Sequence, residues 1–173
     1  INPYITDAAR GHSQWMIDTD TFSHTGSGGT NPGTRMTNAG YVFTGSSKWG
    51  ENIAWNGTTG SLDVLARTRQ AHEDLFIDED YPGRGHRVNI MNNGFREIGA
   101  GVVSGNMSGY NAVMATEDFG RSGTSVFLTG VAYDDATTDD DFYTPGEGLG
   151  GVTVTATRTS DNATFNTTTW ASG

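Results

Sequence analysis

The chain has 173 residues, enough for one ordinary domain or for a domain and part of a second. Its 10 basic and 20 acidic residues give a formal charge of −10, which repels phosphate backbones and disfavours a nucleic-acid role. The chain has no cysteine, which excludes a disulfide scaffold, a zinc–thiolate site and a cysteine nucleophile. No apolar run approaches the roughly 20 residues that a membrane-spanning helix needs.

The first two thirds of the chain mix helical and extended patterns. Apolar side chains recur every three or four positions over residues 5–18, which predicts an amphipathic helix. One or two helical turns are expected over 34–40, and short extended pieces separated by glycine over 41–60. A second helix is predicted from an N-cap at Ser61 to about Phe76. After a Pro/Gly turn at 81–87, alternation predicts strands over 97–103 and 111–119.

Charge is divided unevenly along the chain. Residues 1–121 carry 13 acidic and 9 basic side chains, whereas residues 122–173 carry 7 acidic and 1 basic. Residues 120–124 have the composition of a short linker. Beyond them, 126–133 and 152–158 alternate like strands and no helical pattern occurs. We therefore predict an α+β domain over 1–121, followed by part of an all-β module over 122–173.

Glu73 lies at an unusual position of the second predicted helix. At about 100° per residue, it projects on the face that carries Leu62, Leu65 and Ala66. A carboxylate on an apolar face is costly unless a polar or charged group receives it. His72, about 100° away, is expected to face outward. The periodicity thus favours Glu73 as a functional carboxylate.

Histidine and glutamate provide the remaining chemistry. His24 and His86 follow turn-prone or glycine-rich segments, and Glu51 stands beside Asn52 in an otherwise apolar stretch. Brought together, two imidazoles and two carboxylates would suit a divalent cation such as Zn²⁺, or equally an acid/base set with divergent pKa values. Spacing alone does not bring them together. His12 is expected to be a helix-surface or packing histidine rather than a ligand.

Six ordered motifs carry a family resemblance. They are AARGHS (8–13), FSH (22–24), AGY (39–41), GENIA (50–54), GHRVNI (85–90) and FREIGAGV (95–102). Together they resemble a bacterial CAP domain, of the superfamily of cysteine-rich secretory, antigen 5 and pathogenesis-related proteins. The resemblance covers roughly residues 1–120. The family's opening helix is missing from the matching segment. The loop over 25–34, which follows His24, is long enough to shape the mouth of the cleft that the family has.

The resemblance implies an α-β-α sandwich with a cleft lined by His24, Glu51, Glu73 and His86. Glu73 is the member whose motif matches least well, with Asp74 or Asp78 as substitutes. Some family members bind a divalent ion through the paired histidines, and some have been proposed as peptidases. Because His24 and His86 supply two nitrogen ligands rather than the three usual at catalytic zinc, we expect weak Zn²⁺ binding.

The function that these features predict is a secreted or cell-surface domain that binds metal and interacts with an extracellular protein, peptide or small molecule. A metal-dependent hydrolase, such as a peptidase with Glu51 or Glu73 as general base, is the first alternative. A structural spacer of a bacterial surface protein is the second.

The second module contains a dense acidic cluster. Six acidic side chains fall within fourteen residues between two predicted strands, a composition that suits Ca²⁺ with oxygen-only ligands. The run over 139–154 resembles the start of Sdr-type B repeats and related bacterial β-sandwich modules, in which a calcium loop precedes a Gly-Val-Thr-Val strand. That likeness implies a calcium loop with these ligands: Asp134, Asp139, Asp140 and Glu147. The alternative is a solvated acidic loop.

Overall fold

The computed structural model describes residues 1–79, 81–124, 126–137, 139, 141, 143–144, 146–171 and 173. They divide into two compact units, Ile1–Val126 and Phe127–Gly173. The division therefore follows Val126, whereas the composition predicted a boundary after Arg121. One reason is that strand β3 (Tyr110–Arg121) continues through the first residues of the expected linker.

The first unit is built around a three-stranded antiparallel sheet with the strand order β1-β3-β2. β1 spans Lys48–Thr58, and β2 spans Glu97–Met107. β3 pairs with both neighbours, so β1 is an edge strand. Instead of several short pieces, β1 is one continuous strand, because every one of its residues has a partner in β3.

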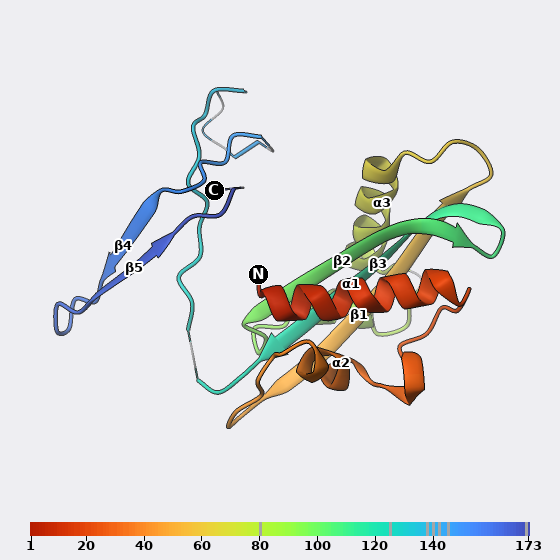
Figure 1. Ribbon diagram of the computed structural model, residues 1–173, viewed down its shortest axis with the longest axis horizontal. Coiled ribbons are helices and arrows are strands. Elements are labelled where there is room, and N and C mark those ends of the chain that lie inside the picture. Colours follow the sequence, from red (N-terminus) through yellow and green to blue (C-terminus); the bar gives the residue numbers. More distant parts are fainter. Residues whose placement is uncertain are drawn as a thin grey trace. The chain divides into compact units, whose positions relative to one another are not determined.

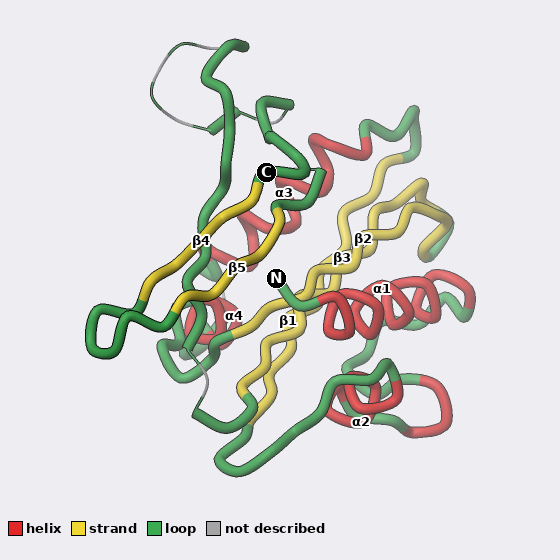
Figure 2. Tube along the Cα trace, turned by 60° about the vertical axis from the view of Figure 1, so that its left-hand side comes forward, coloured by secondary structure: helices red, strands yellow, loops and turns green. Residues whose placement is uncertain are grey.

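Helices cover both faces of this sheet (Figure 1). α1 (Pro3–Asp18) and α2 (Pro32–Asn38) lie on one face, with the short 3-10 turn η1 (Ser27–Gly29) between them in sequence. α3 (Val64–Ile77) and α4 (Gly85–Ile90) lie on the other face, and α4 is visible in Figure 2. This three-layer arrangement confirms the predicted α+β class and α-β-α sandwich.

α1 lies unusually close to β2. The Asn2 side chain caps the helix by accepting from the backbone N–H groups of Tyr4 and Ile5. A Cβ at Gly99 would fall 2.2 Å from a backbone nitrogen of α1, and one at Gly101 would fall 2.1 Å from another. Because only glycine allows this approach, these two positions determine how closely the helix backbone lies against the sheet.

α3 begins later than predicted and buries a different face. Its N-cap is Asp63, whose carboxylate accepts from the backbone N–H of Ala66 at 3.0 Å. The buried residues of the helix are Ala71 and Leu75, whereas Leu65 is 72% exposed. The predicted apolar face was therefore wrong. Glu73 lies about 200° round the helix from both buried residues and is exposed.

The second unit contains a two-stranded antiparallel sheet of β4 (Thr153–Thr157) and β5 (Thr164–Thr168). β4 falls within the strand predicted over 152–158, but β5 was not predicted, because its Thr- and Asn-rich residues show no apolar alternation. The strand predicted over 126–133 does not form. Tyr133 instead makes an isolated bridge to Gly148.

Candidate functional site

His24 and Glu51 form the first of two histidine–carboxylate pairs. The Nδ1 atom of His24 lies 2.7 Å from Oε1 of Glu51, and the two side chains are 54% and 1% exposed. Because an ionised carboxylate only accepts hydrogen bonds, Nδ1 carries a proton, and in the neutral imidazole Nε2 then keeps its lone pair. The structure thus brings together two predicted site residues that are 27 positions apart in sequence.

Two further groups hold the Glu51 carboxylate. The Arg35 guanidinium pairs with Oε2 of Glu51 and also donates to the backbone oxygen of His24 at 3.0 Å. His12 lies with Nε2 3.9 Å from the same Oε2. Burial alone would raise the pKa of Glu51, but the His24 hydrogen bond and the Arg35 charge outweigh burial and lower it. Glu51 is therefore an anchored anion and a weak base.

His12 is buried, with 1% of its surface exposed, which excludes the helix-surface alternative and leaves the packing one. Its Nε2 lies 2.9 Å from the backbone oxygen of Ser23, which accepts the Nε2 proton. Its ring stacks on Trp15 with the centroids 5.6 Å apart. Burial lowers the pKa of His12. The neutral imidazole supports the chain just before His24.

Asp118 is a buried carboxyl group that sequence reasoning missed. It is the cross-strand partner of Glu51, so the two side chains lie on the same face of the sheet. Asp118 is fully buried, and neither of its oxygens accepts a hydrogen bond from the described residues. Burial, together with the nearby negative charge of Glu51, raises the pKa of Asp118 to about 9. At neutral pH it is therefore a neutral acid beside an ionised one.

His86 and Asp78 form the second pair. The Nδ1 atom of His86 lies 2.9 Å from Oδ1 of Asp78, while Oδ2 accepts from the backbone N–H groups of His86 and Arg87 at 2.8 and 3.3 Å. Burial would raise the pKa of Asp78, but the hydrogen bonds from His86 and the two amides lower it. Asp78, one of the two substitutes considered from the sequence, is thus the carboxylate partner of His86.

A third histidine pairs with a carboxylate that sequence reasoning did not consider. His72, expected to face outward, lies with Nδ1 2.6 Å from Oε1 of Glu117, and its side chain is 57% exposed. Glu73, expected to face the cleft, is exposed on α3. The expectation for Glu73 was wrong for the reason given above: the buried stripe of α3 runs through Ala71 and Leu75. His72 is exposed as expected, and it also contacts Glu117.

Asn52 connects these groups through the edge strand. Its amide donates to the backbone oxygen of His86 at 3.1 Å and to Oε2 of Glu117 at 3.2 Å. Asn89 in turn donates to the side-chain oxygen of Asn52 at 3.0 Å. Because successive strand residues point to opposite faces, Glu51 contacts His24 on one side of β1 and Asn52 contacts His86 on the other. Since β1 is an edge strand, an ion shared by the two imidazoles would have to lie at this edge of the sheet.

The convergence of His24 and His86 on one ion stays a prediction. Among the described residues, no group of three or more His, Asp or Glu side chains could hold a metal ion. The donor set fits such an ion in one respect. Each imidazole donates a hydrogen bond from Nδ1–H to a carboxylate and leaves Nε2 for a metal ion, which is the arrangement of metal-binding histidines.

The family is decided by a comparison of the sequence with family models. Residues 1–119 match the model described as "CAP: Cysteine-rich secretory protein family". The chain belongs to the CAP family. The predicted resemblance over roughly 1–120 is thereby confirmed.

A solved structure agrees with this membership. The CAP chain resembles, at a TM-score of 0.52 and 26% identity, an extracellular protein containing a SCP domain from Bacillus anthracis str. Ames. The match covers 70% of this chain but only 33% of that protein, so the chain spans about a third of its length. A search of curated proteins found no match. None of the helices in the described part of this CAP chain is long and apolar enough to cross a membrane.

The acidic cluster lies outside the CAP match. Glu147 is 4% exposed, and its carboxylate accepts from the backbone N–H groups of Thr137 and Thr144 at 2.9 and 2.7 Å. The backbone N–H of Asp134 donates to the backbone oxygen of Glu147 at 3.1 Å. Asp139 is exposed, and Asp140 lies outside the described residues. Glu147 therefore closes its own loop, and the calcium site and the B-repeat likeness stay predictions.

Proposed function

We propose that this CAP domain is part of an extracellular protein and binds a divalent metal ion weakly through Nε2 of His24 and of His86. The single observation that carries the proposal is that each imidazole has its Nδ1 committed to a separate buried carboxylate. Such carboxylates orient the ring and make Nε2 a better donor. With two nitrogen ligands, the ion would be exchangeable, and Zn²⁺ is the metal that best suits imidazole.

The extracellular assignment is supported by the similar SCP-domain protein from Bacillus anthracis, which is described as extracellular. The net charge of −10 disfavours nucleic acid as a partner. The absence of cysteine places no constraint on the partner. An extracellular protein, peptide or small molecule remains the partner class that we propose.

The arrangement of Glu51 favours binding over hydrolysis. A general base must release its lone pair to a water molecule, and an efficient one has a pKa near the working pH. Glu51 instead accepts from His24 and Arg35, and these contacts lower its pKa. Glu73 is exposed on α3, outside these contacts. Catalysis by either residue would require a rearrangement of the site.

The proposal is tested by isothermal titration of the whole chain with Zn²⁺. We expect one weak site that is lost in His24→Ala and in His86→Ala. The matched control is His72→Ala, because His72 is also bonded to a carboxylate through Nδ1 and is exposed to a similar degree, 57% against 54% for His24. Binding that persists in the double variant of His24 and His86, or that disappears in His72→Ala, would overturn the proposal. Circular dichroism checks that each variant folds.

A further inference from the structure

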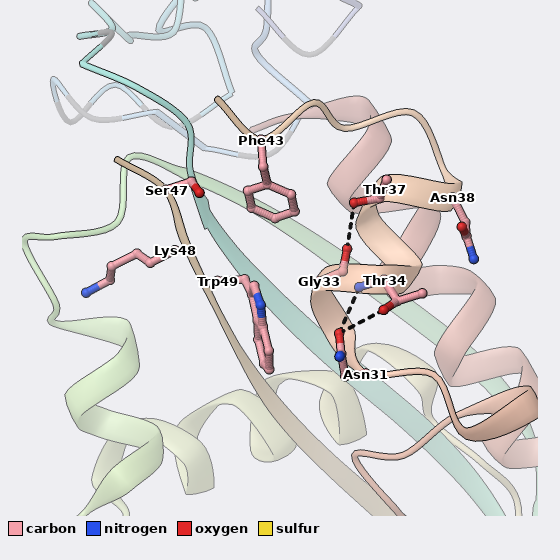
Figure 3. A pocket seen from close by; sticks show the side chains of 9 residues that line it. All are labelled: Asn31, Gly33, Thr34, Thr37, Asn38, Phe43, Ser47, Lys48 and Trp49. Atoms are coloured by element: carbon pink, nitrogen blue, oxygen red, sulfur yellow. Dashed lines mark hydrogen bonds between the residues drawn. The ribbon is translucent and has the colours of Figure 1, made fainter. Parts of the chain in front are cut away.

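A pocket of about 600 Å³ lies between α2 and the start of β1, and neither His–carboxylate pair lines it. Figure 3 shows the polar side chains of α2 on one side and the rings of Phe43 and Trp49 on the other. The volume is in the range of small-molecule sites, which extends from about 300 to 1,000 Å³. The uncharged polar lining comes from Ser47, just before β1, and from four exposed residues at the start and along one side of α2: Asn31, Thr34, Thr37 and Asn38.

Trp49 packs against α2 on one side and is about half exposed to solvent. A Cβ at Gly33 would fall 2.5 Å from Nε1 of the indole, so the glycine lets the ring lie directly against the α2 backbone. The same side chain remains 46% exposed. A large aromatic surface that is fixed and exposed offers apolar contact area to a ligand at little cost in conformational entropy.

The polar side of the pocket offers both donors and acceptors. The Thr34 hydroxyl donates to Oδ1 of Asn31 at 3.1 Å, and the Thr37 hydroxyl donates to the backbone oxygen of Gly33 at 3.0 Å. Both hydroxyl oxygens therefore keep lone pairs for a ligand's O–H groups. The side-chain amides of Asn31 and Asn38 supply N–H donors on the same side.

The pocket carries almost no available charge. Of the described residues that line it, none is Asp, Glu, Arg or His. Its one cation, Lys48, donates to Oδ1 of Asn92 at 3.2 Å and lies 4.3 Å from the centroid of the Phe95 ring. Figure 3 shows the Lys48 side chain pointing away from the pocket. A charged ligand would lose its hydration here without gaining a free counter-charge.

We propose that this pocket binds a neutral oligosaccharide. A pyranose ring has an apolar C–H face, which would pack on Trp49, and hydroxyl groups, each of which donates and accepts. Those hydroxyl groups match the mixed donors and acceptors of Asn31, Thr34 and Asn38. β-Linked sugars fit best, because their equatorial substituents leave the C–H face flat. This site is separate from the proposed metal site, so either can fail without the other.

The test is a titration of the whole chain with β-1,4-linked tetramers of glucose and of N-acetylglucosamine, without metal. Binding is followed by two-dimensional NMR of the backbone amide signals, which every variant retains, and of the indole N–H signal of Trp49, which is assigned by its absence in Trp49→Phe. We expect a saturable shift of that signal with at least one tetramer. Trp49→Ala is expected to weaken binding by about tenfold or more, and Asn38→Ala by a smaller factor.

Phe22→Ala is the matched control, because Phe22 is exposed to the same 46% and does not line the pocket. It is expected to bind as the natural chain does. If Trp49→Ala fails to fold, Trp49→Phe and Asn38→Ala carry the test, since the first keeps an aromatic ring at this position and the second leaves the indole packed against Gly33. No shift with either tetramer at millimolar concentration, equal binding in all variants, or tighter binding of an acidic oligosaccharide would each overturn the proposal.

Discussion

The two histidine–carboxylate pairs share a similar contact, 2.7 Å and 2.9 Å, but they are built in different ways. Glu51 lies 27 residues from His24, and its carboxylate depends on Arg35 and on a protonated Asp118. Asp78 lies only eight residues from His86 and is held by backbone amides of the same turn. One pair therefore depends on several packed elements, whereas the other is largely local.

The largest expected effect comes from removing the cation beside Glu51. Arg35→Met leaves a buried carboxylate without its main counter-charge, which costs about 3–5 kcal/mol of unfolding free energy in comparable buried pairs. Urea denaturation measures this loss. Arg67→Met is the control, because Arg67 donates to the neutral side chain of Asn56 at 2.7 Å, and its loss should be markedly smaller. Equal losses would show that Arg35 does not balance the charge of Glu51.

A smaller effect is expected in the local pair. Asp78→Asn keeps the shape of the side chain but loses the charge-assisted bond from His86, so we expect a loss of about 1–2 kcal/mol near neutral pH. Because the pKa of Asp78 is lowered in the folded state, its ionised form stabilises the fold above the ordinary aspartate pKa. The difference from the natural chain should therefore shrink as the pH falls through and below about 4. A difference independent of pH would contradict this account.

Asp118 should respond to pH in the opposite direction. Its pKa is raised to about 9, so between about pH 4 and pH 9 the folded state holds a proton that the unfolded state releases. Stability contributed by Asp118 is therefore full below pH 4 and declines as the pH rises towards 9. Asp118→Asn keeps the shape of the side chain without its titration and should gain at least about 1 kcal/mol at pH 8, with no gain at pH 4.

Unfolding curves of the natural chain and of Asp118→Asn at the two pH values measure this difference. The neutral substitution Thr116→Val on the same strand is a useful comparison. Thr116 is also fully buried, and its hydroxyl lies 2.8 Å from that of Ser13, so its replacement should cost stability equally at both pH values. A gain in Asp118→Asn that is the same at pH 4 and pH 8 would rule out a proton held by Asp118.

Glu147 extends the comparison to the second unit, because it is held by backbone amides as Asp78 is. If the predicted calcium loop forms, millimolar Ca²⁺ should raise the melting temperature slightly, by about 1–3 °C, since a ligand that binds only the folded state stabilises it. Differential scanning calorimetry measures the shift, and Glu147→Gln should remove it. An unchanged melting temperature would contradict the calcium site and would mean that Glu147 only holds its own loop together.

The sequence motifs predicted the family, the three layers and that His24 and Glu51 belong to one site. Helical periodicity failed on α3, because Leu62 lies before the helix and Leu65 is exposed. Asp118 could not be singled out from composition, since its burial depends on the register that sets it opposite Glu51. The structure shows that the neighbours of Asp118 in β3 are buried on both faces of the sheet. Asp78 was recognisable only as one of two nearby acids.

The contact between α1 and the two glycines of β2 has a consequence for engineering this domain. The backbone of α1 lies directly against the backbone of β2 at Gly99 and Gly101. The position of the helix on the sheet therefore depends little on which side chains α1 carries near these glycines. Outward-facing positions of α1 can therefore be recoded, for labels or for new binding surfaces, without displacing His12 or Ser13. Library designs should leave the two strand glycines untouched and draw their diversity from the helix.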